Sequence, residues 1–246
     1  MSIQKILKER IISKYNLAKE LDPLEGLVLL VDKPKDWTSF DVVNKIRFAL
    51  KHSLKVKKIK VGHAGTLDPL ATGLLLICVG KYTKLIDELA SMSKTYEAGL
   101  KFGAVTASYD AECEEEDIKT NVPQSSQEID AVLPLFTGAI LQVPPIYSAI
   151  KIDGKEAYKM ARAGKDVEMK QRPVTIHSYK LLQYNKPFAS FFIDCSKGTY
   201  IRSMAHDLGQ TLGCGAYLTS LVRTSIDEYQ LENSLSLDEI LAFIGK

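Results

Sequence analysis

The sequence has little cysteine, no long apolar run and almost no net charge, and each shortage excludes a class of protein. Its four cysteines stand far apart with no Cys-x-x-Cys pair, so a disulfide framework is not expected. The longest apolar run, from Leu74 to Val79, is far shorter than the roughly 18 residues of a membrane-spanning helix. Intrinsic disorder is excluded because 46% of the 246 residues are hydrophobic and the formal net charge is only +2.

Common signatures of cofactor, metal and hydrolase sites are absent as well. Gly80-Lys81 is followed by Tyr82 instead of Ser or Thr, and neither a GxGxxG nor a GxSxG pattern occurs. The four histidines show no HxxxH spacing and no nearby cysteine pair, so we expect no metal site. The N-terminus shows neither a signal pattern nor the composition of a transit peptide, so we expect a cytoplasmic protein. With 32 basic and 30 acidic residues, binding to a nucleic acid would require a local basic patch.

The pattern of apolar residues predicts an α+β fold with a mostly antiparallel or mixed sheet, because strands and helices alternate without a regular βαβ rhythm. Strands are expected over 27–31, 74–79, 95–102, 174–182 and 189–195, and helices over 1–20, 42–49, 125–135, 155–163, 200–212 and a short segment after 236. Ser39 or Asp41 is expected to cap the helix over 42–49, and Ser236 with Glu239 has capping-box spacing. We divide the chain into an N-terminal helical extension (1–25), one main domain (26–225) and a short helical tail (226–246).

The segment from Gly62 to Gly73 is the most informative part of the chain. It reads Gly-His-Ala-Gly-Thr-Leu-Asp-Pro-Leu-Ala-Thr-Gly, and its three glycines and one proline without any period predict an ordered loop. Asp68 is the only carboxylate in it. An Asp before Pro is a common turn former, whereas a carboxylate on a stiff loop can also act as a nucleophile or a base. The loop by itself leaves both interpretations open.

Other residues bear on this choice without deciding it. Arg202 stands where a predicted strand gives way to a helix, and an arginine there can keep a buried carboxylate ionised or can simply lie on the surface. Tyr96 and Tyr200 are either core aromatics or platforms on which a nucleobase stacks. The lysines at 55, 57, 58 and 60 form either a solvated face or a contact with phosphates.

Five motifs in the same order resemble those of the TruB-type tRNA pseudouridine synthase family. The resemblance covers about residues 26–224, and agreement of five ordered motifs by chance is negligible. The motifs are Asp32-Lys33-Pro34 with Trp37-Thr38-Ser39-Phe40-Asp41-Val42-Val43, the loop Gly62–Gly73, Lys94-Thr95-Tyr96, Pro144-Pro145-Ile146-Tyr147-Ser148-Ala149, and Cys195-Ser196-Lys197-Gly198-Thr199-Tyr200-Ile201-Arg202 continuing through Asp207-Leu208-Gly209.

The resemblance implies the pseudouridine synthase fold and the isomerisation of uridine 55 in the T-loop of tRNA, by base flipping and without cofactor or metal. It implies that Asp68 is the nucleophile, that Tyr96 packs on the target base and is a candidate for moving the C5 proton, and that Arg202 pairs with the aspartate. The other residues that match the family's site are the uracil-pocket residues Tyr200 and Leu221, the space-filling His63, Asp110 of the active-site network, and Lys33 and Lys84 near the RNA.

The chain also departs from the family's usual pattern. Asp36 stands where the first motif usually has a glycine, so the turn has to form without one. Many members carry a C-terminal RNA-binding PUA domain, and the chain is expected to be a short form without it. We therefore expect RNA to be held by the lysines of 55–60 and by an insertion over 151–172, which we predict grips the T-loop and T-stem. No membrane and no obligate protein partner are expected.

Three other functions remain as alternatives. A binding protein of the same fold would flip bases without chemistry, and the presence of Asp68, Tyr96 and Arg202 together argues against it. A guide-RNA-dependent synthase would be expected to carry the missing C-terminal domain. A tRNA uridine methyltransferase would need a glycine-rich cofactor loop, which the sequence does not show.

Overall fold

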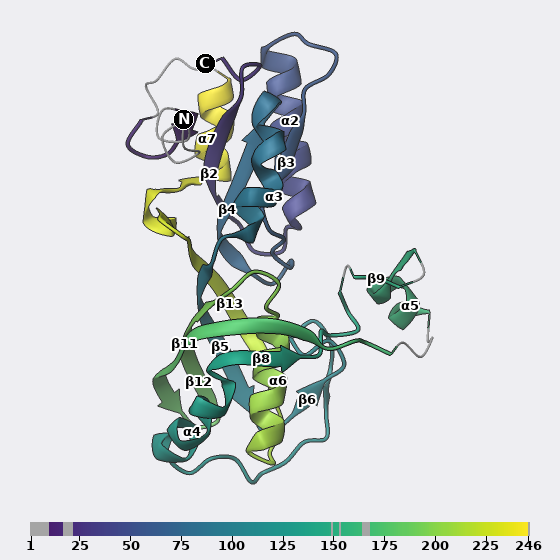
Figure 1. The fold of residues 1–246 in the computed structure, drawn as a ribbon, viewed down its shortest axis with the longest axis vertical. Coiled ribbons are helices and arrows are strands. Elements are labelled where there is room, and N and C mark those ends of the chain that lie inside the picture. The colour runs from purple at the N-terminus through teal and green to yellow at the C-terminus, as the bar shows by residue number, and fades with distance from the viewer. Residues whose placement is uncertain (1–9, 17–21, 149, 153, 164–167, 246) are drawn as a thin grey trace. The chain divides into compact units, whose positions relative to one another are not determined.

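The computed structural model describes residues 10–16, 22–148, 150–152, 154–163 and 168–245 as two compact units. The first unit consists of Met1–Thr95 with Val222–Lys246, and the second consists of Tyr96–Leu221. The chain passes between the units inside two strands, β5 (Lys94–Phe102) and β13 (Ala216–Ile226). Strands and helices of both units are drawn in Figure 1. The α+β class and the mixed sheet predicted from the sequence are confirmed.

The first unit is built on two antiparallel strands that are buried on both faces. β2 (Leu27–Lys33) pairs with β4 (Thr72–Val79) along its whole length, from Leu27 opposite Val79 to Lys33 opposite Gly73. Alternate residues of both strands enter two separate apolar clusters, one on each face. Because both faces are covered, the strands read as continuous apolar runs in the sequence, with no alternation of polar residues.

Helices and short strands complete this unit. α2 (Ser39–Ser53) and α7 (Leu237–Ile244) pack on one face, while the 3-10 segment η1 (Gly80–Leu85) and α3 (Ile86–Ser91) pack on the other. β3 (Val61–His63) is antiparallel to β4, and Val222 and Arg223 of β13 pair with it in the parallel direction. Two short strands, β1 (Ile11–Ile12) and β15 (Leu235–Ser236), each pair with β2 in the parallel direction. After β13 the chain forms its antiparallel partner β14 (Tyr229–Gln230) and then the 3-10 turn η3 (Leu231–Asn233).

The second unit is an antiparallel sheet with one long helix. Its strands follow the order β13, β5, β12 (Phe188–Cys195), β11 (Arg172–Asn185) and β8 (Gly138–Gln142), and α6 (Ile201–Thr211) supplies many of its buried residues. Smaller elements are α4 (Ser126–Val132), the turn η2 (Leu133–Phe136), and the paired strands β6 (Val105–Thr106) and β7 (Glu115–Glu116).

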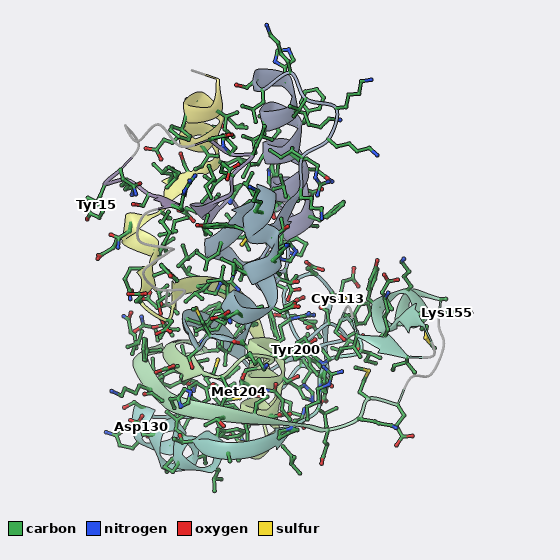
Figure 2. The ribbon with its side chains drawn as sticks, turned by 45° about the horizontal axis from the view of Figure 1, so that its top comes forward. Tyr15, Cys113, Asp130, Lys155, Tyr200 and Met204 are labelled. Carbon is green, nitrogen blue, oxygen red and sulfur yellow. The ribbon has the colours of Figure 1, made fainter. Side chains whose placement is uncertain are left out.

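An arm projects from the sheet of the second unit where the sequence predicts an insertion. It contains β9 (Lys151–Ile152), β10 (Lys155–Glu156) and α5 (Ala157–Arg162), and Figure 1 shows β9 and α5 standing apart from the sheet strands. Lys155 lies at the outer side of this arm in Figure 2. None of the helices in the described ranges is long and apolar enough to cross a membrane.

Several expected elements differ in detail from those observed. Most of the helix predicted over 1–20 lies outside the described residues, and within them Ile11 and Ile12 form a strand because their β-branched side chains pack beside β2. The helix predicted over 125–135 ends at Val132, where Pro134 enforces a 3-10 turn. The helix predicted over 155–163 begins only at Ala157, after the strand β10.

The helix that precedes the Gly62–Gly73 loop in the fold is capped by a residue that the sequence analysis did not select. Thr38 is the N-cap of α2, and Asp41 is at position N3, where the two side chains form a reciprocal capping box. Neither Ser39 nor Asp41 is the N-cap, because Thr38 alone has the extended backbone that precedes the first turn. The capping box predicted for Ser236 and Glu239 at the start of α7 is confirmed.

Candidate active site

Asp68 lies in a loop between β3 and β4 whose backbone is tied down on several sides. The Ser39 hydroxyl accepts a hydrogen bond from the Leu67 amide at 2.8 Å and donates to the Leu67 carbonyl at 3.0 Å. The Ala71 amide donates to the Asp68 carbonyl at 3.1 Å, which closes a turn around Pro69. Leu67 and Ala71 are buried, whereas Asp68 itself is only half-buried. A rigid backbone thus presents a carboxylate that remains partly accessible.

Asp36 makes the turn that usually needs a glycine. Its φ angle of 65° places it in the left-handed region, which Asp tolerates better than most residues. Its amide donates to the Pro69 carbonyl at 2.8 Å, so the turn also holds the Asp68 loop. The departure from the family's pattern therefore leaves the turn intact.

Lys33 lies beneath this loop, fully buried, with 0% of its surface exposed. Its ammonium group donates to the carbonyls of Pro34 at 2.8 Å and Trp37 at 2.5 Å, and lies 3.5 Å from that of Pro69. Burial lowers the pKa of Lys33 to about 8, and the nearby Asp68 carboxylate opposes that shift. This place differs from the RNA-facing one that the resemblance implies, because an unexposed ammonium cannot reach a phosphate. Lys84, in η1, is exposed.

Arg223 is a second buried cation at the loop, and the sequence analysis did not identify it. Its side chain is 1% exposed, and it donates through Nε to the Leu74 carbonyl at 2.7 Å and through Nη2 to the Gly65 carbonyl at 3.1 Å. Desolvation, together with the charge of Arg223, lowers the pKa of His63, which stands at the start of the loop. A neutral imidazole is therefore favoured there near pH 7.

In the second unit Arg202 forms a buried ion pair with Asp110. Their side chains are 6% and 1% exposed, and Nη1 lies 3.5 Å from Oδ2. The guanidinium also donates to the carbonyls of Ser108 at 3.2 Å and Tyr147 at 2.9 Å. Asp110 in turn accepts from the Ser108 hydroxyl at 2.6 Å. A buried pair with this many additional bonds holds the arginine in one orientation.

The remaining predicted residues of this unit lie on its central strands and at the start of α6. Tyr96 in β5 and Leu221 in β13 are buried, and Tyr200 is the N-cap residue of α6. Gln142 accepts a hydrogen bond from the Tyr200 amide at 2.8 Å and donates to its carbonyl at 3.0 Å, which anchors the turn before Arg202. Tyr200 and Met204 are both labelled in Figure 2, and the Met204 amide donates to the Tyr200 carbonyl at 3.1 Å.

The predicted residues thus fall into two groups. The first unit carries His63, Asp68, Lys33 and Lys84, of which Lys33 and Asp68 interact electrostatically. The second unit carries Tyr96, Asp110, Tyr200, Arg202 and Leu221, of which Asp110 and Arg202 are paired. Within the described ranges, no three or more His, Cys, Asp or Glu side chains are arranged to hold a metal ion.

Burial of one further carboxyl group gives a prediction about stability. Desolvation raises the pKa of Asp207, on α6, to about 6. The folded chain therefore keeps the proton of Asp207 up to about pH 6, while the unfolded chain loses it near pH 4. The contribution of Asp207 to the free energy of unfolding is thus fully present below pH 4 and is lost as the pH rises through 6. Asp207→Asn removes the charge that is buried at pH 8, and because the group is partly exposed we expect a gain in unfolding free energy of only about 1 kcal/mol. This gain corresponds to a rise in Tm of about 3 °C at pH 8, while Tm at pH 4 should stay nearly unchanged. Thermal unfolding at both pH values tests this, with Asp130→Asn as an exposed control; an equal gain at both would contradict it.

Comparison with known proteins gives one family. The model described as TruB family pseudouridylate synthase (N terminal domain) matches residues 51–201, and that of the tRNA pseudouridylate synthase B C-terminal domain matches residues 202–245. The chain is 46% identical to tRNA pseudouridine synthase B of Parabacteroides distasonis, over 91% of the chain and 95% of that protein. It is 49% identical to the protein of the same name from Phocaeicola vulgatus, over 87% of the chain and 91% of the relative.

Solved structures with the same fold come from larger chains. One, titled as a Cbf5-Nop10-Gar1 complex, aligns with a TM-score of 0.67 and 28% identity over 89% of this chain and 54% of that one. Another, titled as an H/ACA RNP bound to a substrate RNA containing 2'-deoxyuridine, aligns with a TM-score of 0.63 and 25% identity over 87% of this chain and 52% of that one. The chain therefore spans about half the length of these solved chains.

Proposed function

The chain belongs to the TruB family of pseudouridylate synthases and is a tRNA pseudouridine synthase, and we propose that it isomerises uridine 55 in the T-loop with Asp68 as the nucleophile. The observation that carries the proposal is the loop of Asp68, whose backbone is held by Ser39 and Asp36 while the carboxylate stays partly accessible. A nucleophile needs this combination, because its position must be fixed before the substrate arrives.

In the proposed reaction Asp68 attacks the target nucleotide, at either C1′ of the sugar or C6 of the uracil. The glycosidic bond between N1 and C1′ breaks, the uracil turns over, and C5 bonds to C1′. The bond between Asp68 and the nucleotide then breaks, which restores the carboxylate, and N1 takes up a proton from water. The proton on C5 is then released, and Tyr96 is the candidate group for moving it. No cofactor is required, because the bond that breaks and the bond that forms both belong to the substrate.

The target uridine has to leave the T-loop stack before a carboxylate can reach it. Flipping a base costs a few kcal/mol, and stacking on an aromatic side chain returns about 1–3 kcal/mol. We propose that Tyr96 provides this stacking surface, that Tyr200 and Leu221 line the uracil pocket, and that His63 fills the space left near the flipped base. The neutral form of His63, favoured by its lowered pKa, suits this role because it adds no charge to an apolar contact.

Arg202 is proposed to pair with Asp68 and keep it ionised, since an unpaired carboxylate in an apolar pocket tends to take up a proton. The ion pair with Asp110 and the bonds to the Ser108 and Tyr147 carbonyls support this proposal, because they hold the guanidinium plane in place. We propose that Asp110 orients the arginine and does not itself react.

Two basic surfaces are proposed to hold the tRNA, together with Lys84. The lysines at 55, 57, 58 and 60 are all exposed, and none forms a salt bridge with another of the described residues. In the arm, Lys151, Lys155 and Lys159 are exposed, and Lys159 lies 2.7 Å from Glu156. Exposed cations are suited to phosphates, and each contact made with a phosphate adds salt dependence to binding.

Replacing Lys151, Lys155 and Lys159 with Gln is expected to lower tRNA affinity and to reduce the slope of log K against log salt by about 2, since one of the three is partly neutralised by Glu156. Binding titrations at four salt concentrations measure the slope. A matched triple, Lys81, Lys101 and Lys119 to Gln, removes lysines that already pair with carboxylates and should leave the slope unchanged. Equal slopes for wild type and the arm variant would rule out the proposed grip.

Release of tritium from unmodified tRNA labelled at C5 of uridine tests the proposed function directly. Release by the wild-type protein, without added metal or cofactor, together with mapping of the product to position 55, is the expected result. Tight tRNA binding with no release would favour the alternative in which the protein binds and remodels RNA without chemistry.

A further inference from the structure

Two glycines, Gly65 and Gly73, stand on either side of Asp68, and both lie next to Arg223. A Cβ atom built on Gly73 would lie 2.4 Å from the carbonyl oxygen of Arg223, closer than any side chain allows. A Cβ atom on Gly65 would lie 3.4 Å from Nη1 of the same residue. Both glycines also have positive φ angles, of 98° and 100°. At Gly73 the backbone of Arg223 leaves no room for a side chain, whereas at Gly65 the contact is an ordinary one and it is the positive φ angle that favours glycine.

The guanidinium of Arg223 bonds to the backbone at both ends of this loop. Nη2 donates to the carbonyl of Gly65, three residues before Asp68, and Nε donates to the carbonyl of Leu74, just after the Gly62–Gly73 loop. The strand pairing of Arg223 with Gly73 adds a third point of attachment. A planar group with fixed donors can hold two carbonyls at a set separation, which a flexible ammonium cannot do.

Burying a charged guanidinium is costly unless its donors are satisfied, and an apolar side chain would fill the same volume at lower cost. Arg223 is also close enough to Lys33 for the two cations to repel each other, which lowers the pKa of Lys33. Stability alone therefore gives little reason to place an arginine here. The position of the bonds at both ends of the Asp68 loop gives a functional one.

We propose that Arg223 is a positioning residue for the reaction: by bonding to Gly65 and Leu74 it sets the span of the loop, and with it the place of the Asp68 carboxylate. This inference rests on the proposed role of Asp68. Arg223 itself is not proposed to touch the substrate, since it is fully buried behind the loop.

Arg223→Lys tests the proposal because it keeps the charge and loses the two-point bond. The single-turnover rate of pseudouridine formation is expected to fall about 100-fold, since a displacement of about 1 Å in a reacting group has this effect. The Kd for tRNA is expected to stay within about threefold of wild type. Arg47→Lys is the matched control, because Arg47 donates to the Val61 carbonyl at 2.9 Å, outside the loop. The single-turnover rate of this variant should equal that of the wild type.

The rate is measured on the fraction of enzyme that binds tRNA, obtained by stoichiometric titration. A merely structural role would reduce this fraction and leave the rate constant of the bound enzyme at the wild-type value, and that result would overturn the proposal. Gly65→Ala provides a second test if Arg223→Lys does not fold. It disturbs the same end of the loop with Arg223 present, and we expect a rate loss of at least about tenfold with Kd preserved; a wild-type rate would overturn the proposal.

Asp68→Asn in the same assay separates the two hypotheses. If Asp68→Asn is inactive while Arg223→Lys reacts at the wild-type rate, only the role of Arg223 is refuted. If Asp68→Asn remains active, the proposed function itself fails, and the role of Arg223 fails with it.

Discussion

Asp68→Asn is expected to lower the rate of pseudouridine formation by roughly 10⁴-fold or more while leaving tRNA affinity within about tenfold of wild type. The amide keeps the size and shape of the carboxylate, so the turn around Pro69 should survive. It loses the negative charge and the nucleophilic oxygen, which the chemical step requires. Tritium release under single-turnover conditions measures the rate, and filter binding measures the affinity.

Asp87→Asn is the appropriate control for this variant. Asp87 lies exposed in the first turn of α3, in the same unit as Asp68, and takes part in no proposed contact with RNA. Its substitution should leave both rate and affinity at the wild-type level. A parallel loss of binding and turnover in Asp68→Asn, with a lowered Tm, would show that Asp68 shapes the loop and does not carry the chemistry.

Arg202→Lys is expected to lower the rate about 100- to 1,000-fold. Lysine keeps the positive charge but cannot bond in a planar, two-pronged fashion to a carboxylate while also donating to the Ser108 and Tyr147 carbonyls. The buried Asp110 would then lose part of its compensation, so a decrease in Tm is expected as well. Single-turnover kinetics and thermal unfolding, with Arg47→Lys as the control, measure the two effects.

Asp110→Asn tests the role of the Asp110 charge in orienting Arg202, without changing the charge of Arg202 itself. It leaves Arg202 in place and removes the partner that orients it, so a smaller loss than that of Arg202→Lys is expected, on the order of tenfold. A wild-type rate for Arg202→Lys would refute the pairing with Asp68, whatever its effect on Tm.

Features that depend on residues adjacent in the chain could be predicted from the sequence. The apolar runs of β2 and β4 predict buried strands whichever elements pack against them. Ser236 and Glu239 form the predicted capping box because both residues stand at the start of one helix. The Gly62–Gly73 loop could be recognised for the same reason, since its glycines and Asp68 are adjacent in the chain. The family followed from five such local motifs and their order.

The distant residues that support these motifs are visible only in the folded protein. Lys33 looks like a surface lysine in the sequence, yet it lies buried beneath a loop 36 residues further along the chain. Arg223 reaches Gly65 across 158 residues, and nothing in the residues around it signals that contact. Ile11 and Ile12 fit a helical pattern in the sequence, but in the structure they form a strand because they pair with β2. In each case the deciding free energy comes from burial and from hydrogen bonds made across the fold, which depend on contacts that local sequence does not encode.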